Sequence, residues 1–249
     1  MNCAQAGAPG TGKSQSLLTL VPFTEASKKP FVIIDADNKL GDNPDFKKPI
    51  ADGKFVIMVP GTKTSEGSFE DKIKRAATLQ PPKLAPQGWI AVGSIMDDLE
   101  TNHNLFCGVA LDTITSVEDH IKKYIAFTNK RGKFEYADWE SLLLSWKELF
   151  NTFYSLDIPL KILNMHTQYE KDDLTGKVTL LPLMTGSFRN QAGRDMSEFY
   201  QTFAKPNVGK PPTYMWQVAP DSRFIARSVV FKNQIEVVQD WTPVWQTLL

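Results

Sequence analysis

The residues best suited to chemistry begin at position 7, where the chain reads Gly7-Ala8-Pro9-Gly10-Thr11-Gly12-Lys13-Ser14 and matches G-x-x-x-x-G-K-[ST]. Glycines in this pattern permit a turn whose backbone N–H groups converge on phosphates, and its lysine reaches the β- and γ-phosphates. The hydroxyl of Ser14 can ligate Mg²⁺. A helix expected over residues 14–20 would present its positive end to the anion. The stretch ending at Gln15 is therefore predicted to bind a nucleoside triphosphate.

A second informative stretch, residues 107–112, is a short run of small and apolar residues that closes on Asp112. This is the Walker B pattern, whose carboxylate holds Mg²⁺, partly through water, opposite the phosphate loop. A strand-end aspartate is a weak signal by itself, and the intact phosphate loop upstream strengthens it. Ser14 and Asp112 are thus the predicted metal ligands.

The strands that must position these side chains are visible as four runs, residues 2–6, 31–34, 55–59 and 160–165. The first is only partly apolar, but it has to enter the phosphate loop; the others are typical of buried parallel strands. Asp35 and Asp37 follow one of these runs, and His166 follows another. Because the carboxyl ends of parallel strands share one sheet edge, these polar side chains are expected near the phosphate loop.

Segments with helical spacing lie between the strands, at residues 89–99, 117–127 and 136–156. Such alternation predicts an α/β fold with a doubly wound, mainly parallel sheet and the nucleotide at its C-terminal edge. The tail is expected to add strands at 213–218 and 224–231. We predict a single domain over 1–249, with approximately 205–249 packed on the core or extending it.

Composition narrows the possible partners and environment. The chain has 28 Lys+Arg and 28 Asp+Glu, so any contact with nucleic acid has to come from a local cluster rather than from net charge. Two cysteines, Cys3 and Cys107, are too few for a disulfide framework and are expected to be buried thiols. No leader and no apolar run of about 18 residues is present, which predicts a cytoplasmic protein without a membrane partner.

The order of these motifs resembles the RecA-type core. More closely, the chain resembles phage-encoded RecA-fold ATPases of single-strand annealing and recombination. The resemblance covers nearly the whole chain and is carried by the phosphate loop, by Val-Ala-Leu-Asp-Thr-Ile-Thr-Ser, by Ile-Leu-Asn-Met-His and by Ala-Pro-Asp-Ser-Arg with Ala-Arg-Ser beyond it. It implies an ATPase that uses Mg²⁺, stimulated by single-stranded DNA, in a bacterial host cytoplasm.

The resemblance also assigns catalytic residues. Lys13 and Asp112 keep the roles given above, and Glu66 would orient or deprotonate the attacking water. Two more residues lie between Pro60 and Glu66 than in the RecA-type pattern, so Asp35 and Asp37 compete for that role, and a solvated surface glutamate is a further interpretation. His166 would sense the γ-phosphate, with a core histidine as the alternative.

Two further sets of residues follow from the RecA resemblance. A basic residue acting across a subunit interface implies a homo-oligomer, and the candidates are Arg189, Arg194, Arg227 and Lys232. Single-stranded DNA is expected at residues 170–194 and at 128–136, where the candidates are Lys130, Arg131, Lys133, Phe134 and Tyr136. Each of these side chains has an ordinary structural or solvated role as its alternative. The tail residues Trp241, Trp245, Leu248 and Leu249 could dock a neighbour or pack on their own sheet.

Two other functions remain open at this stage. One is an assembly or regulatory module that is gated by a nucleoside triphosphate without DNA activity. The other is a phosphotransferase of the nucleotide-kinase type. No arginine-rich lid follows the Walker B stretch, which disfavours a kinase, although Arg189 and Arg194 keep it in view.

Overall fold

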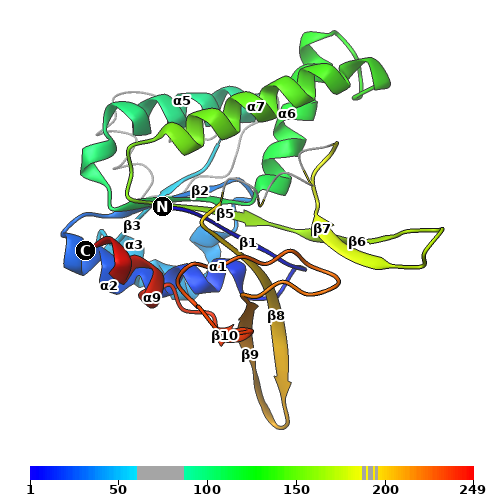
Figure 1. The fold of residues 1–249 in the computed structure, drawn as a ribbon. Coiled ribbons are helices and arrows are strands. Elements are labelled where there is room, and N and C mark those ends of the chain that lie inside the picture. The colour runs from blue at the N-terminus through cyan, green and yellow to red at the C-terminus, as the bar shows by residue number, and fades with distance from the viewer. Residues whose placement is uncertain (61–86, 187–188, 190–192, 194–195) are drawn as a thin grey trace.

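The computed structural model describes residues 1–60, 87–186, 189, 193 and 196–249. These residues form an eight-stranded sheet at the centre of the fold (Figure 1). Neighbouring strands are parallel from β8 to β3, and β9 and β10 add an antiparallel edge. In spatial order the strands are β10 (Glu236–Val238), β9 (Lys210–Gln217), β8 (Glu198–Asn207), β1 (Asn2–Ala6), β5 (Leu160–Met165), β4 (Gly108–Asp112), β2 (Phe31–Asp35) and β3 (Phe55–Met58).

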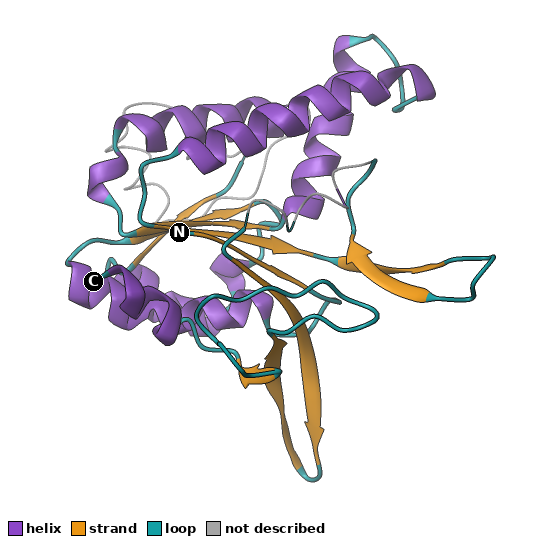
Figure 2. Cartoon of the chain, in the orientation of Figure 1, coloured by secondary structure: helices purple, strands orange, loops and turns teal. Residues whose placement is uncertain are grey.

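Helices cover both faces of this sheet (Figure 2). One layer consists of α5 (Gln87–Thr101), α6 (Ile114–Thr128) and α7 (Trp139–Ser155). The other contains α1 (Lys13–Ser16), α2 (Val21–Ser27), α3 (Pro44–Ala51) and α9 (Thr242–Trp245). Short 3₁₀ turns are η1 (Leu17–Leu20), η2 (Leu40–Asp42), η4 (His103–Leu105), η5 (Tyr136–Asp138) and η6 (Gln246–Leu248).

The core is divided by the sheet into two apolar clusters, because successive side chains of a strand point to opposite faces. On β2, Val32 and Ile34 join the cluster under α5, α6 and α7, whereas Phe31 and Ile33 join the cluster that contains α2 and α9. A doubly wound, mainly parallel α/β sheet is the fold class predicted from the sequence, and it is confirmed. The strand before the phosphate loop, the strand that ends at Asp35, the strand that ends at Asp112 and the strand before His166 all belong to this one sheet.

Several element boundaries differ from the sequence prediction. The helix expected over 14–20 is α-helical only to Ser16 and then tightens into η1, and the helix expected from residue 136 begins at Trp139 after η5. Residues 167–182 form a hairpin that is a separate two-stranded sheet. Its strands are β6 (Thr167–Lys171) and β7 (Val178–Pro182).

The strand expected over 224–231 is absent in the structure, where this stretch contributes a single bridge between Phe199 and Arg227. The reason lies in Glu198, a fully buried residue whose carboxylate accepts the backbone N–H groups of Val229 and Val230 at 2.9 and 3.2 Å. The hydroxyl of Ser228 donates to the same carboxylate at 2.5 Å. These N–H groups are therefore bound to a side chain rather than to a neighbouring strand.

The tail packs on its own chain. Trp241 is fully buried and Trp245 stacks on Phe23 with ring centroids 5.5 Å apart, so these two residues belong to the core instead of forming an apolar docking segment. Cys3 and Cys107 are both buried and free, as predicted. Among the helices described here, none combines the length and the apolar character needed to cross a membrane.

Candidate functional site

The phosphate loop leaves the carboxyl end of β1, between β5 and β8. Gly10 and Gly12 have φ values of 77° and 86°, in the left-handed region that side chains disfavour. Close packing explains the other requirement for glycine: a Cβ on Gly7 would lie 2.0 Å from Oγ1 of Thr202, and one on Gly12 would lie 2.6 Å from the ring of Tyr214. The loop is thus fixed against β8 and β9.

The side chain of Lys13 folds back into the phosphate loop. Its ammonium donates to the carbonyl oxygens of Gly7 and Ala8, each at 2.8 Å, and the residue is 5% exposed. Burial lowers the pKa of Lys13 to about 8, although the carboxylates of Asp112 and Asp37 act in the opposite direction. An anion bound in the loop would favour the charged lysine, so this geometry is suited to a phosphate.

Ser14 and Asp112 meet directly, with the Ser14 hydroxyl donating to Oδ2 of Asp112 at 2.6 Å. Asp112 ends β4, is 3% exposed, and has a pKa raised by burial against the opposing effect of the Ser14 hydrogen bond. Its other oxygen, Oδ1, is buried without a hydrogen-bond partner in the described part of the chain. A hydroxyl beside a buried carboxylate oxygen that has no hydrogen bond fits Mg²⁺, which prefers oxygen ligands.

That cation would have to bind together with phosphates and water. Among the described residues, no group of three or more His, Cys, Asp or Glu side chains could hold a metal ion by itself. Mg²⁺ in phosphate-transfer sites usually keeps several waters and takes one or two protein ligands plus phosphate oxygens. The Ser14 and Asp112 pair matches that type of site.

A buried amide network supports the loop from below. Gln5 on β1 donates through Nε2 to the carbonyl oxygen of Lys13 at 2.9 Å and to Oδ1 of Asn164 at 2.8 Å. The indole N–H of Trp216 donates to Oε1 of Gln5 at 2.9 Å. Sequence reasoning missed Gln5 and Asn164, which are both fully buried. The available signal was the presence of an amide residue within each of the runs at 2–6 and 160–165, because a buried amide has to find hydrogen-bond partners.

The acidic pair after β2 separates into two different roles. Asp35 is 1% exposed, and its Oδ2 accepts the backbone N–H groups of Lys39 and Leu40, both at 2.8 Å. Burial raises the pKa of Asp35 to about 6, and these hydrogen bonds oppose the shift. Its carboxylate is therefore occupied in shaping the turn that follows β2.

Asp37 is bound by side chains instead of backbone groups and acts electrostatically on Lys13 of the phosphate loop. Burial alone would raise the pKa of Asp37, but hydrogen bonds from Lys39 and Ser116 outweigh it and lower the pKa below its usual value. The Lys39 ammonium lies 2.8 Å from Oδ2, and Ser116 on α6 donates to Oδ1. Asp37 also acts electrostatically on Lys13 and His166, so an ionised carboxylate stands beside the expected position of the γ-phosphate.

His166 follows β5, between the phosphate-loop strand and the Walker B strand. Burial first, and then the Lys13 ammonium, lower the pKa of His166, so its ring is neutral at pH 7. Its backbone N–H points to Oγ1 of Thr115 at 3.3 Å, and its carbonyl accepts from Leu183 N–H at 2.7 Å. The histidine is thereby tied to the start of α6 and to the end of the β6–β7 hairpin.

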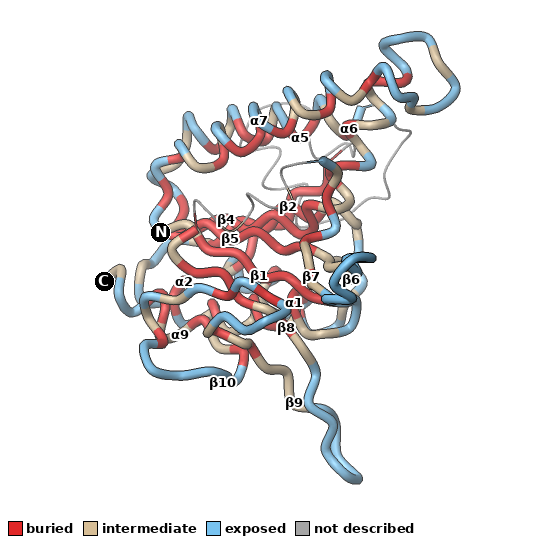
Figure 3. The backbone as a smooth tube through the Cα atoms, turned by 45° about the vertical axis from the view of Figure 1, so that its right-hand side comes forward, coloured by how far each residue is buried: buried red, intermediate tan, exposed pale blue. Residues whose placement is uncertain are grey.

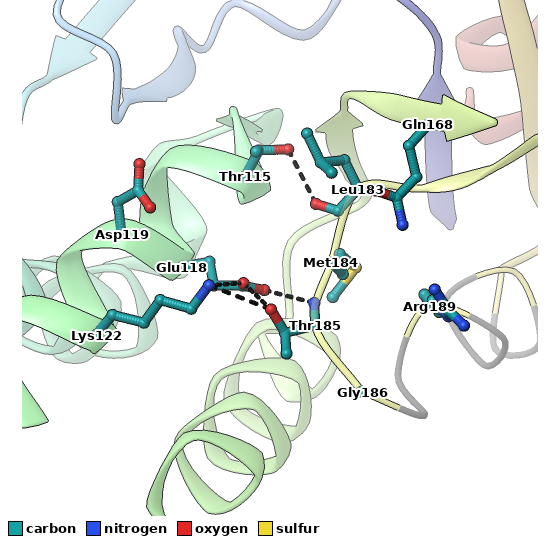
Figure 4. A pocket seen from close by; sticks show the side chains of 10 residues that line it. All are labelled: Thr115, Glu118, Asp119, Lys122, Gln168, Leu183, Met184, Thr185, Gly186 and Arg189. Atoms are coloured by element: carbon teal, nitrogen blue, oxygen red, sulfur yellow. Dashed lines mark hydrogen bonds and ion pairs between the residues drawn. The ribbon is translucent and has the colours of Figure 1, made fainter. Parts of the chain in front are cut away.

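A polar cavity of about 490 Å³ adjoins this region, between α6 and the segment after β7 (Figure 4). Glu118 is its buried carboxylate: it pairs with Lys122 at 2.6 Å and accepts the backbone N–H of Thr185 at 2.8 Å. Thr115 lines the same cavity, and Arg189 lies on the side away from Asp119. The sequence analysis did not single out Glu118, whose burial only the fold reveals.

The basic residues predicted to act across an interface have different surroundings. Arg189 pairs with Glu170 at 2.8 Å. Arg227 bridges Phe199 through backbone hydrogen bonds of 2.7 and 2.8 Å, and Lys232 is exposed. Arg194, like the predicted water-activating Glu66, lies outside the described residues.

The predicted DNA loop at 128–136 is partly engaged within the fold. Arg131 forms a 2.6 Å ion pair with Asp138, and Phe134 packs edge-on against Trp139 with ring centroids 5.4 Å apart. Lys130, Lys133 and Tyr136 are exposed. Only these three of the five predicted DNA-binding side chains extend freely from the tip of the α6–α7 pair.

An open cavity of about 350 Å³ lies beside the loop on the β9 and β10 side. Its lining combines Gln15, Leu18 and Thr19, which follow the phosphate loop, with Tyr214, Val238 and Gln239. Gln239 donates through Nε2 to the carbonyl oxygen of Thr11 at 2.8 Å, so the tail also holds the loop itself. The sequence offered no sign of Tyr214 or Gln239, because both lie 200 or more positions from the loop.

Comparison with known proteins gave no matching family model and no matching curated protein. Among solved structures, a KaiC-like protein of the hyperthermophilic archaeon Pyrococcus horikoshii OT3 is similar, with a TM-score of 0.46 and 11% sequence identity. The match covers 94% of this chain and 82% of that one.

Proposed function

We propose that this protein hydrolyses ATP in the presence of Mg²⁺. The observation that carries the proposal is the 2.6 Å hydrogen bond between Ser14 and Asp112, next to the lysine of an intact phosphate loop. Phosphoryl transfer to water needs positioning and charge stabilisation more than covalent participation by the protein. The residues gathered at this edge of the sheet have the chemistry for both tasks.

Each residue has a proposed part. Lys13 moves from the loop carbonyls to the β- and γ-phosphates, and Ser14 with Asp112 holds Mg²⁺. Bound Mg²⁺ offsets negative charge on the phosphates. Asp37 orients the attacking water, because it is ionised, acts electrostatically on Lys13 and His166, and is less committed to backbone groups than Asp35. His166 senses the γ-phosphate and conveys its presence to the β6–β7 hairpin through Leu183.

Tyr214 and its cavity complete the proposed nucleotide site. The cavity adjoins Gln15, the residue at which the phosphate-binding stretch ends, and offers one aromatic ring with aliphatic neighbours. Such a lining suits the base and ribose of the nucleotide. We therefore place the nucleoside between η1 and β9.

We further propose single-stranded DNA as the partner and a homo-oligomer as the working form, with recombination or annealing in a phage setting as the context. The support is the resemblance of the motif order to RecA-type ATPases. A basic residue from a neighbouring subunit would complete the site, and Arg227 and Lys232 are the exposed candidates among the described residues.

Steady-state ATP hydrolysis by the wild-type protein and by Lys13→Ala tests the proposal, with and without single-stranded DNA at low and physiological salt. Turnover that requires Mg²⁺ and is lost in the variant supports the ATPase. Stimulation by DNA that weakens with salt supports the DNA partner. Nucleotide binding without turnover would instead favour a nucleotide-gated assembly module, and hydrolysis indifferent to DNA would remove the recombination role.

A further inference from the structure

The β8–β9 hairpin extends well beyond the body of the protein (Figure 1). We call residues 203–214 the arm. All residues from Ala204 to Pro212 are exposed, and Val208 at its tip is fully exposed (Figure 3). Beyond its root the arm pairs only with itself, so nothing in the described fold explains its length.

The two faces of the arm differ in what they contact. Side chains alternate along a strand, so Thr202 and Ala204 share one face while Phe203 and Lys205 share the other. The first face meets the phosphate loop: the hydroxyls of Thr202 and Thr11 lie 2.6 Å apart, and Tyr214, paired with Ala204, closes on Gly12. The second face has no such neighbour.

Cationic groups collect on this second face. Lys210 pairs with Asn207 beyond a register shift in the hairpin, which follows the pair of Lys205 with Thr213. The side-chain amide of Asn207 donates to Oγ1 of Thr213 at 2.9 Å, so Asn207 and its partner Lys210 lie on the same side as Lys205. The arm has no acidic residue, and neither lysine has an ion pair with any described residue. Phe203 lies on the same face and is partly exposed.

The same face continues toward the body into an apolar cavity of about 550 Å³. Phe199 lies four positions before Phe203 and lines this cavity together with Phe224 and Ile225. Arg227, the bridge partner of Phe199, and Arg189 are its charged residues. This face of β8 therefore leads from the lysines near the tip to the cavity at the body, over about 26 Å from Asn207 to Phe199. At the cavity Phe199 and Phe224 are largely buried, and the two arginines come from outside the strand.

We infer that single-stranded nucleic acid binds along this face of β8, with phosphates on Lys205 and Lys210 and a base in the cavity beside Phe199. Cations that follow the backbone combined with aromatic side chains that stack bases are the features of such sites, which take four or more nucleotides. This inference rests on the proposed DNA partner and moves the main contact from residues 128–136 to the arm.

Edge protection is a simpler explanation for lysines on an exposed hairpin, because lysine and proline both discourage aggregation of open strands. Pro206, Pro211 and Pro212 already supply that protection in the arm. The placement of both lysines on the face that leads to the cavity is not required for it.

The test compares Lys205→Gln/Lys210→Gln with Lys130→Gln/Lys133→Gln, which makes the same change of charge in the loop at 128–136. The probe is a fluorescent oligothymidylate, titrated at several salt concentrations. We expect the arm variant to bind about tenfold more weakly at low salt, with a salt slope shallower by about 1.4 because two phosphate contacts are lost. The loop variant should bind like the wild type.

A second measurement uses Val208→Cys labelled with a fluorophore, since Cys3 and Cys107 are buried. The Kd for unlabelled oligothymidylate, read from the fluorescence of this label, should equal the Kd read from the anisotropy of the fluorescent oligothymidylate. Unchanged binding by the arm variant, or loss confined to the loop variant, would overturn the inference while leaving the DNA partner intact. No binding by the wild type would overturn both, and ATP hydrolysis measured without DNA would still decide the ATPase separately.

Discussion

The hydroxyl of Ser14 lies 2.6 Å from the carboxylate of Asp112, although the two residues are 98 positions apart. Asp112→Asn should lower Mg²⁺-dependent ATP turnover by about 10²-fold to 10³-fold, because the amide keeps the shape but loses the charge. Nucleotide affinity measured in EDTA should be the same for variant and wild type. Equal turnover by the two proteins would exclude Asp112 as a metal ligand.

The lowered pKa of Lys13 predicts that nucleotide affinity depends on pH. Its pKa is about 8 without a bound anion, and phosphates would raise it, so binding takes up a proton above pH 8. The Kd for ATP should therefore rise about tenfold per pH unit from pH 8 to 9.5. Lys13→Arg should flatten this profile, since a guanidinium stays protonated, and parallel profiles would contradict the assignment.

The acidic pair after β2 provides matched variants for catalysis. Asp37→Asn should lower kcat by about 10²-fold with little change in ATP affinity, because its carboxylate is the proposed water-orienting group. Asp35→Asn should keep most of the turnover, because an amide oxygen can still accept from Lys39 and Leu40. Full activity in Asp37→Asn would return the role to Glu66, for which Glu66→Gln is the direct variant.

The raised pKa of Asp35 predicts that the free energy of unfolding depends on pH. The folded protein raises the pKa of this buried carboxyl to about 6, so ionisation favours unfolding, and the wild type loses stability as pH rises from about 4 to 6. A shift of about two pKa units corresponds to about 3 kcal/mol. Urea unfolding of Asp35→Asn without nucleotide should show the variant gaining up to that amount relative to wild type between pH 4 and 7. A constant difference would contradict the raised pKa.

A variant of Tyr214 distinguishes binding of the nucleoside from binding of the phosphates. Tyr214→Ala should weaken Mg·ATP binding by about tenfold, because stacking on an aromatic ring contributes about 1–3 kcal/mol per base. Binding of Mg·tripolyphosphate, which has no base, should be unchanged. A parallel loss for both ligands would mean that Tyr214 acts only by supporting Gly12.

The sequence alone determined the alternation of strands and helices, and it supplied the candidate phosphate loop and the candidate Walker B aspartate. These features are local: glycines at turn positions, a lysine and serine at fixed spacing, and short apolar runs all report on a few neighbouring residues. The same locality explains the boundary errors at η1 and η5, since the tightening of a helix into a 3₁₀ turn depends on packing rather than spacing.

Only the tertiary structure decided which distant groups surround the loop. Gln5 with Asn164, Thr202, Tyr214 and Gln239 act through contacts between residues more than 150 positions apart, which no spacing rule contains. The fold also separated Asp35 from Asp37, because one carboxylate accepts backbone N–H groups and the other accepts from the side chains of Lys39 and Ser116. It likewise replaced a predicted strand at 224–231 with a segment bound to Glu198, since a buried carboxylate competes with a strand for the same N–H donors.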